Sequence, residues 1–317
     1  MDNFWQKLKR PFFVQAPMAD GTDFVYRQII AKYGRPDVMY TEFVSADGLA
    51  HPEARQKLLW DLEYNDGERP IVAQIFSGRP ETIEKSAALI RELGFDGIDI
   101  NMGCPDRSVE KQGAGASLIK DFDRAVEVIR AAKRGAGDVP VSIKTRIGYK
   151  KVITREWASL LLAEDIAALT LHLRTREEMS KVPARWEEIS TVTEIENKNN
   201  TVIIGNGDIT SLKEAEERAR EYNIDGVMIG RGLFGNPWFF SGREDITINE
   251  RLDVMVEHAQ LFEEHHRDKK NFLIMRKHVG AYVKGFVGAG QLRESLMKTQ
   301  TAKEVSAIIS EYKSMGK

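Results

Sequence analysis

The stretch GIDINMG (residues 97–103) is a short apolar run that is bounded by glycines and followed at once by a polar loop. Runs of this kind are typical of buried strands. Eight of them recur along the chain, and most are followed by a segment of helical periodicity. They are FFVQAPM (12–18), VMYTEFV (38–44), IVAQIF (71–76), GIDINMG (97–103), VSIKTRIG (141–148), ALTLHL (168–173), VIIGNG (202–207) and GVMIGRG (226–232). Eight strands alternating with helices predict an α/β fold, a (β/α)8 TIM barrel.

Two of the connecting segments carry clear helix signals. PETIEKSAALIREL, from Pro80, and DFDRAVEVIRAAKRG, from Asp121, are amphipathic, and the second opens with an Asp cap and closes on a glycine. A doubly wound open sheet is the rival fold. It would carry a glycine-rich turn after its first strand, and QAPMADGTD (15–23) does not fit that fingerprint.

The composition restricts the class of protein. Cys104 is the only cysteine of 317 residues, so an intrachain disulfide, a CxxC pair and a thiolate zinc site are excluded. We expect no metal site and a reducing, cytoplasmic environment. The N-terminus lacks the apolar core of a signal peptide, and no apolar run is long enough to span a membrane. The formal charge of −2 predicts no polyanion partner for the chain as a whole, although local charge can differ.

Polar residues at the carboxyl ends of barrel strands are the best candidates for chemistry, because active sites of this fold lie there. In chain order these ends offer Pro17, Met18 and Ala19; Glu42 and Ser45; Gln74; Asn101 and Cys104; Lys144 and Arg146; His172 and Arg174; Asn206 and Asp208; and Gly230 with Arg231. One face of the barrel is thus predicted to gather a lysine, a histidine, an amide and a thiol.

The loops after the last two strands, GNGDIT and GRGLFGNPW, favour a phosphate site, since glycines let the backbone approach and Arg231 adds charge. Glycine is also common in barrel turns. With Lys144, Gln74 and His172 nearby, flavin mononucleotide (FMN) fits, because a lysine would stabilise the negative charge of a reduced flavin. Alternatively, Lys144 forms an internal ion pair with Asp99 or Glu42, and the histidine is a core residue.

Cys104 can serve as a general acid, because an ordinary thiol is protonated at neutral pH. A nucleophile would need a lowered pKa, and a structural cysteine would lie in the core. The loop composition around Cys104 favours the general acid. The glycine-rich stretch KQGAGASLI (111–119) follows a polar loop, so we expect a flexible loop leading into a helix.

From Thr247 onward the chain is predicted to be helical, with 3.6-residue spacing in INERLDVMVEHAQLFEEHH, NFLIMRKHVGAYVKGF and TAKEVSAIISEYKSM. We therefore expect a barrel domain over 1–246 and a helical domain over 247–317. Residues 267–303 contain nine Lys or Arg and two acidic residues. A basic face with interleaved aromatics suits folded RNA, and a solvated helix face is the alternative.

Six motifs in this order resemble those of the tRNA dihydrouridine synthases: QAPMADGTD, NMGCPDRSVEKQGAGASLI, SIKTRIG, LHLRTR, IGNGDI and MIGRGLFGNPW. The match runs from about Pro11 to the region of Thr301. The resemblance implies an FMN-dependent barrel that reduces the 5,6 double bond of selected uridines in tRNA, with NADPH as the reductant. It also implies a cytoplasmic enzyme with no membrane or metal partner, which we expect to be a monomer.

Site residues follow from the resemblance position by position. Cys104 resembles the thiol that protonates C5 after hydride reaches C6. The flavin contacts correspond to Pro17, Met18, Ala19, Gln74, Lys144, His172, Asn206, Gly207, Asp208, Gly230 and Arg231. Substrate contacts correspond to Asn101, Arg174, Arg276 and Lys277.

The chain departs from the family pattern at three places, one of which is the loop PDRSVEK (105–111), which is more basic in other members. Many members have Gly-Val where this chain has Asp20-Gly21, and glycine where it has Leu173. Two rival functions stay open, namely an FMN barrel that acts on a small molecule and an RNA-binding protein without catalysis. The basic helical tail disfavours the first, and the presence of Cys104 and Lys144 disfavours the second. The motifs do not specify which uridine is modified.

Overall fold

The computed structural model describes residues 3–196 and 199–315. These residues form two compact units. The first contains the described part of residues 1–17 and 36–230, and the second contains the described part of residues 18–35 and 231–317. The predicted division at 246/247 differs from these limits because residues 18–35 and 231–246 pack with the helical tail. Whether the tail alone is the tRNA-binding domain stays a prediction.

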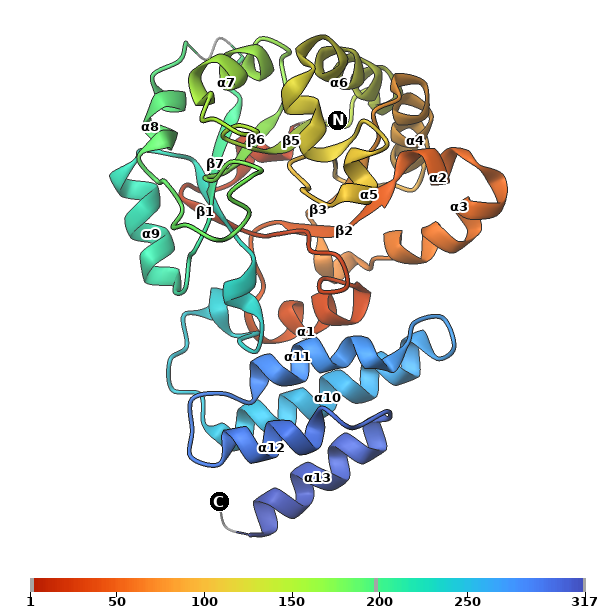
Figure 1. Ribbon diagram of the computed structural model, residues 1–317, viewed down its shortest axis with the longest axis vertical. Helices are drawn as coiled ribbons and strands as arrows, with labels where there is room; N and C mark the ends of the chain where they lie inside the picture. The colour runs from red at the N-terminus through yellow and green to blue at the C-terminus, as the bar shows by residue number, and fades with distance from the viewer. Residues whose placement is uncertain (1–2, 197–198, 316–317) are drawn as a thin grey trace. The chain divides into compact units, whose positions relative to one another are not determined.

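The first unit is a sheet of eight parallel strands surrounded by helices (Figure 1). The strands are β1 (Phe12–Gln15), β2 (Met39–Ser45), β3 (Ile71–Phe76), β4 (Gly97–Met102), β5 (Val141–Arg146), β6 (Ala168–His172), β7 (Val202–Asn206) and β8 (Gly226–Ile229). Their order is β1-β8-β7-β6-β5-β4-β3-β2, and a parallel bridge between Val14 and Val38 joins the two ends. The predicted (β/α)8 barrel is confirmed.

The outer elements of this unit connect successive strands, except for η1, which precedes β1. They are η1 (Phe4–Lys7), α2 (Ala46–Ala50), α3 (Pro52–Leu58), η2 (Leu59–Leu62), η3 (Asp66–Glu68), α4 (Pro80–Glu92), α5 (Arg107–Glu110), η4 (Gly115–Lys120), α6 (Phe122–Ala136), α7 (Thr154–Leu162), α8 (Glu188–Thr193) and α9 (Leu212–Glu221). Asp121 caps α6 as predicted, by accepting a hydrogen bond from the N–H of Arg124. The helix runs on to Ala136, however, so Gly135 does not end it. A Cβ at Gly135 would lie 2.1 Å from the carbonyl oxygen of Glu84, so this glycine lets α4 and α6 pack closely.

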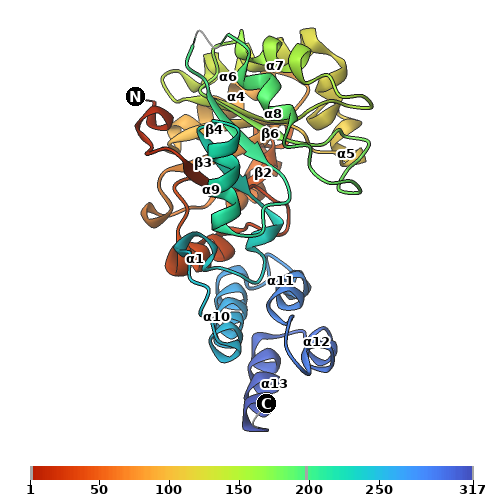
Figure 2. The same ribbon diagram turned by 90° about the vertical axis from the view of Figure 1, so that its left-hand side faces the viewer.

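The second unit is all-helical (Figure 2). It contains α1 (Phe24–Gly34), η5 (Arg231–Leu233), η6 (Phe239–Ser241), α10 (Ile248–His266), η7 (Phe272–Ile274), α11 (Met275–Tyr282), α12 (Ala289–Leu296) and α13 (Ala302–Ser314). Val25 and Ile29 of α1 share one apolar core with Trp238 and with residues of α10 to α13, which explains why α1 belongs here. Helix α12 is not evident as a separate helix from the sequence, because glycines interrupt its surroundings.

Two features are absent from the described residues. Within residues 3–196 and 199–315, no helix is long and apolar enough to cross a membrane. Within the same ranges, no three His, Cys, Asp or Glu side chains are grouped as metal ligands.

Candidate active site

The ends of β3, β4 and β5 lie in register and bring three predicted residues together. Asn101 is paired with Lys144, and Gln74 with Asp99, in neighbouring strands. The Asn101 amide donates to Gln74 Oε1 at 3.0 Å, and Gln74 Nε2 donates to Asp99 Oδ2 at 2.7 Å. Ser142 donates to the other Asp99 oxygen at 2.6 Å. This buried chain fixes the orientation of Asn101.

Gln74 is fully buried, and both polar atoms of its amide bind protein groups. The structure therefore gives it a part in holding Asn101, and its contact with a flavin stays a prediction. From the sequence, Asp99 is expected only as a possible ion-pair partner of Lys144. The sequence analysis does not predict its place in this chain of hydrogen bonds. The signal was present in the sequence, since a carboxylate in the middle of an apolar strand needs buried partners.

Asn101 in turn holds the cysteine loop. Its side-chain oxygen accepts hydrogen bonds from the backbone N–H of Gly103 at 3.1 Å and of Cys104 at 2.9 Å. Arg146 donates from Nε to the Gly103 carbonyl at 2.7 Å. Arg176 binds the Glu110 carboxylate and donates to the Pro105 carbonyl at 3.1 Å. The loop that carries the thiol is thus fixed on both sides of Cys104, and sequence reasoning missed Arg176.

The prediction of a flexible loop over residues 111–119 is wrong in one respect. The second half of this stretch is the buried 3-10 helix η4. The N–H of Ala116 donates to the Cys104 carbonyl at 3.0 Å. Gly115 has a φ of +60°, and a Cβ there would lie 2.8 Å from that carbonyl oxygen. The glycine is therefore required for the backbone to support the cysteine loop closely.

The Cys104 thiol is partly buried, and burial raises its pKa above the ordinary value, while the charge of Arg146 acts in the opposite direction. Such a thiol is protonated at neutral pH. It can donate a proton without further activation, whereas a nucleophilic thiolate would need a lowered pKa. The environment therefore favours the predicted general acid.

Lys144 has its own fixed place on β5. Its Nζ donates to Asn206 Oδ1 at 3.2 Å, and the Asn206 amide donates to the Met228 carbonyl at 2.7 Å. Burial, together with the charge of Arg146, lowers the pKa of Lys144 to about 8. Burial also raises the pKa of Asp99 to about 6. Asn206 accepts from one of the three ammonium N–H groups of Lys144. Lys144 therefore has further N–H groups that can donate to an anionic ligand.

His172, Arg174 and Asp208 form a second group. Arg174 is buried, binds the Asp208 carboxylate, and places Nη1 3.3 Å from His172 Nε2. It also donates from Nε to the Val182 carbonyl at 2.6 Å. Leu173 is fully buried, and its N–H donates to the Asn206 carbonyl, so this departure from the family pattern packs inward. The contacts predicted for Arg174 with substrate and for Asp208 with phosphate stay predictions.

The predicted phosphate loops start at the ends of β7 and β8. Gly205 and Gly207 are buried, and Cβ atoms there would lie 2.5 Å from the Trp186 ring and 2.6 Å from the Ala184 side chain. The Trp186 indole donates to the Gly207 carbonyl at 3.0 Å. Packing within the chain thus already accounts for both glycines. The phosphate contacts of Asn206, Gly207 and Gly230 are not tested by these observations.

The remaining predicted residues lie at different places in the fold. Pro17 is buried in the first unit, two residues after β1. The second unit contains Met18, Ala19, Arg231, Arg276 and Lys277. Of these, Ala19, Arg231 and Lys277 are exposed, and Lys277 donates to two backbone carbonyls of the second unit.

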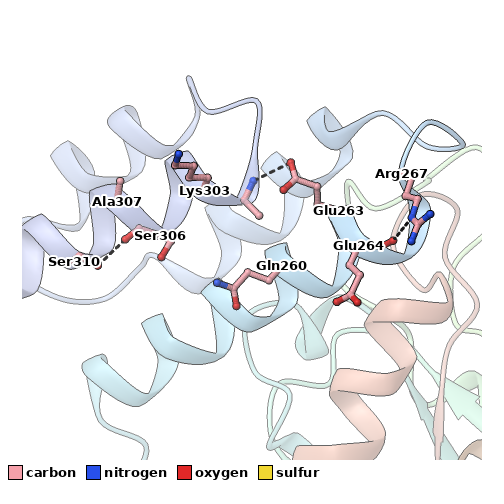
Figure 3. Close-up of a pocket in the computed structure, with 9 residues that line it drawn as sticks. Gln260, Glu263, Glu264, Arg267, Lys303, Ser306, Ala307 and Ser310 are labelled. Atoms are coloured by element: carbon pink, nitrogen blue, oxygen red, sulfur yellow. Dashed lines mark hydrogen bonds between the residues drawn. The ribbon is translucent and has the colours of Figure 1, made fainter.

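The second unit also has an open hollow along α10 and α13, with a volume of about 700 Å³ (Figure 3). Its charged lining residues are Glu263, Glu264, Arg267 and Lys303. Glu263 accepts a hydrogen bond from the N–H of Ala302 at 3.3 Å, at the first residue of α13. This balanced set of charges does not favour a polyanion, and we place the candidate active site at the strand ends.

The chain is similar to known proteins over nearly its whole length. The family model described as dihydrouridine synthase (Dus) matches residues 14–315. The chain is 42% identical over 316 residues to the "Probable tRNA-dihydrouridine synthase" of Staphylococcus aureus strain MRSA252, covering 98% of this chain and 96% of the relative. It is 41% identical over 316 residues to the "Probable tRNA-dihydrouridine synthase 2" of Bacillus subtilis strain 168, covering 98% of this chain and 97% of the relative.

Solved structures support the fold alone. Histamine dehydrogenase from Rhizobium sp. 4-9 superposes with a TM-score of 0.56 at 13% identity, covering 77% of this chain and 46% of that one. The 6-hydroxypseudooxynicotine amine oxidase of Pseudomonas geniculata N1 superposes with a TM-score of 0.57 at 12% identity, covering 86% and 54%.

Proposed function

The chain belongs to the dihydrouridine synthase family, whose members are oxidoreductases, and from this premise we propose that it reduces selected uridines in tRNA to dihydrouridine. FMN is the proposed cofactor and NADPH the proposed reductant. The observation that carries the proposal is the place of Cys104 at a strand end, where its backbone N–H donates to the Asn101 side-chain oxygen at 2.9 Å; burial raises the pKa of its thiol.

The residues of this chain supply the proton and the charges. Bound FMN would supply the hydride that reaches C6 of the uracil ring. Hydride addition leaves enolate-like charge on the substrate, and Cys104 donates its Sγ proton to C5. Solvent then restores the thiol. The cysteine thus completes the addition of two hydrogens across the 5,6 bond.

The residues present fit an anionic, ring-containing cofactor. Lys144 is a half-buried ammonium that can donate further hydrogen bonds, and such a charge stabilises an electron-rich ring in a low-dielectric site. We propose Pro17, Met18, Ala19, Gln74 and His172 as further ring-side contacts, and the loops after β7 and β8, including Arg231, as the phosphate side. These assignments follow the motifs of the family.

Spectroscopy of the purified protein tests cofactor and substrate together. We expect flavin absorption bands that bleach when NADPH is added without oxygen and recover when unmodified tRNA is added. A protein that binds no flavin contradicts the cofactor assignment. Recovery with a small enone, and none with tRNA, supports the small-molecule rival instead.

The role of Cys104 has a direct test. Cys104→Ala is expected to keep flavin and tRNA binding and to lose most uridine reduction. Because Cys104 is the only cysteine, its alkylation rate as a function of pH gives the thiol pKa without interference. A pKa well below 8 contradicts the general-acid assignment, as does full activity of the alanine variant.

We propose that the second unit binds the tRNA, with Arg276 as one contact, and that the protein acts as a cytoplasmic monomer of 35.9 kDa. Residues 267–303 carry the excess of basic side chains. Deleting 247–317 is a poor test, because it exposes the core that includes Val25 and Trp238. A better test replaces Lys269 and Lys270 with glutamine. We expect weaker tRNA binding with a smaller salt dependence and unchanged flavin content.

A further inference from the structure

Residues 18–22, which follow β1, form a tight turn within the second unit. The Met18 carbonyl accepts hydrogen bonds from the N–H of Gly21 and of Thr22, both at 3.0 Å, and Thr22 Oγ1 accepts one from the N–H of Met18 at 2.9 Å. Asp20 has a φ of +52°, in the left-handed region that favours glycine. A side chain at this position therefore needs compensation from its surroundings.

Lys277 of α11 supplies a contact at this strained position. Its Nζ donates to the carbonyl of Ala19 at 3.1 Å and to the carbonyl of Asp20 at 3.2 Å. One ammonium group thus joins two successive carbonyls, which a left-handed residue turns toward the same side. Hydrogen bonds from a charged donor are stronger than those between neutral groups, so the bridge restrains the turn.

The other end of the turn is fixed to the same helices. Asp23 caps α1 by accepting from the N–H of Tyr26 at 2.8 Å, and its second oxygen lies 3.1 Å from Nε2 of His266, at the end of α10. Both side chains are buried. Arg27, which is fully buried, donates to the Thr22 carbonyl at 2.9 Å. The helical unit therefore holds residues 18–23 at both ends.

The surroundings of Lys277 favour a structural contact over a phosphate contact. A hollow of about 370 Å³ is lined by Asp20, Asn271, Leu273, Ile274 and Lys277. An RNA phosphate entering it would meet the Asp20 carboxylate and would compete with two carbonyls for the ammonium.

We propose that Lys277 is a positioning residue that fixes the turn at residues 18–22, and with it the predicted cofactor contacts Met18 and Ala19. The inference rests on the proposed function insofar as those two residues contact FMN. Besides its proposed binding of tRNA, the helical unit then positions two of the proposed cofactor contacts of its own. The bridge supports the left-handed backbone conformation that Asp20 adopts in this chain.

The test compares three full-length variants. Lys277→Met removes the donor, Lys277→Arg keeps one, and Lys284→Met removes an exposed charge of the same unit that does not contact the turn. Hydrogen exchange of the Gly21 and Thr22 amides is measured without cofactor. The FMN dissociation rate is then measured by fluorescence, and tRNA affinity at two salt concentrations.

We expect Lys277→Met to accelerate both hydrogen exchange at the two amides and FMN release by about tenfold. This is the lower end of the range for the loss of a charged hydrogen-bond donor, because Lys277 is exposed. Lys277→Arg should restore both, and Lys284→Met should change neither. Loss of tRNA affinity alone, with unchanged exchange, overturns the proposal and makes Lys277 a phosphate contact. If neither the wild-type protein nor any variant binds FMN, the proposed function fails. The hydrogen-exchange measurement then still decides the role of Lys277.

Discussion

The side-chain oxygen of Asn101 lies 2.9 Å from the backbone nitrogen of Cys104 and accepts its hydrogen bond. Since the Asn101 amide is itself held by Gln74, and Gln74 by Asp99, the thiol loop is anchored in the interior of the barrel. Asn101 thereby fixes the position of Cys104, the proposed proton donor.

Replacing Asn101 with alanine should lower uridine reduction by about 10- to 100-fold, because loss of the anchor misplaces the donor. Flavin binding should be unchanged. The measurement is the single-turnover rate of a flavin-reduced sample mixed with unmodified tRNA. Asn101→Asp is the comparison variant: its carboxylate still accepts the two backbone N–H groups but cannot donate to Gln74, and it should retain more activity than Asn101→Ala. Equal rates for the two variants would show that the anchor does not matter.

The affinity for FMN should fall as pH rises above about 8. The pKa of Lys144 is lowered to about 8 by burial and by Arg146, so the side chain is charged below that pH and loses its charge above it. If the ammonium binds the cofactor, linkage predicts about tenfold weaker binding per pH unit. Titration of apoprotein with FMN from pH 7 to 9.5 measures this. Lys144→Met should bind FMN weakly at every pH. Lys150→Met, which replaces an exposed lysine in the loop after β5, should bind FMN like the wild type.

The helical unit should lose stability in mild acid. Burial and mutual repulsion lower the pKa of His258 to about 3, and burial lowers that of His278 to about 4. The unfolded chain, with histidine pKa values near 6.5, binds more protons between those limits. Stability is therefore full above about pH 6.5 and falls as pH decreases toward 4. Between pH 7.5 and pH 5 we expect the free energy of unfolding to fall by on the order of 4 kcal/mol. Urea unfolding, monitored at residues of the second unit, measures this change.

A matched variant checks the source of that loss. The His278 ring lies 4.9 Å from Tyr26 and 4.7 Å from His258, centroid to centroid, and its Nδ1 is buried without a hydrogen-bond partner among the described residues. His278→Phe keeps the ring and removes the titrating group. It should reduce the pH-dependent loss by about half. Asp23, whose pKa is held low by His266, affects stability only in stronger acid.

Replacing Asp208 with asparagine should destabilise the barrel by about 2 kcal/mol, because it leaves the Arg174 guanidinium without its counter-charge. The Arg174 side chain is 3% exposed and that of Asp208 is 36% exposed, so solvent reduces the effect below that of a fully buried pair. The control is Asp245→Asn, in an exposed pair with Arg243, which should cost less than about 0.5 kcal/mol. Urea unfolding compares the two. Equal effects would show that Arg174 does not depend on Asp208.

The sequence by itself determined the barrel, because the repeat of short apolar runs and amphipathic helices is a local property of the chain. GIDINMG became β4, and the segment 248–266 became α10 with the predicted limits. The cysteine loop was also readable, because the strand end, the lone thiol and the following proline are adjacent in the chain. These features depend on periodicity and on residues that are adjacent in the sequence.

Tertiary structure alone decided which groups meet. Asp99, Gln74 and Asn101 come from β4 and β3, and their hydrogen bonds depend on the strand register. The place of α1 depends on where Val25 and Ile29 find apolar partners, which lie more than 200 residues further along the chain. Lys277 resembled a phosphate contact in the sequence, and its two carbonyl acceptors at Ala19 and Asp20 are visible only in the fold. The physical reason is the same in each case, because a hydrogen bond or a packed contact is set by distance in space and not by separation along the chain.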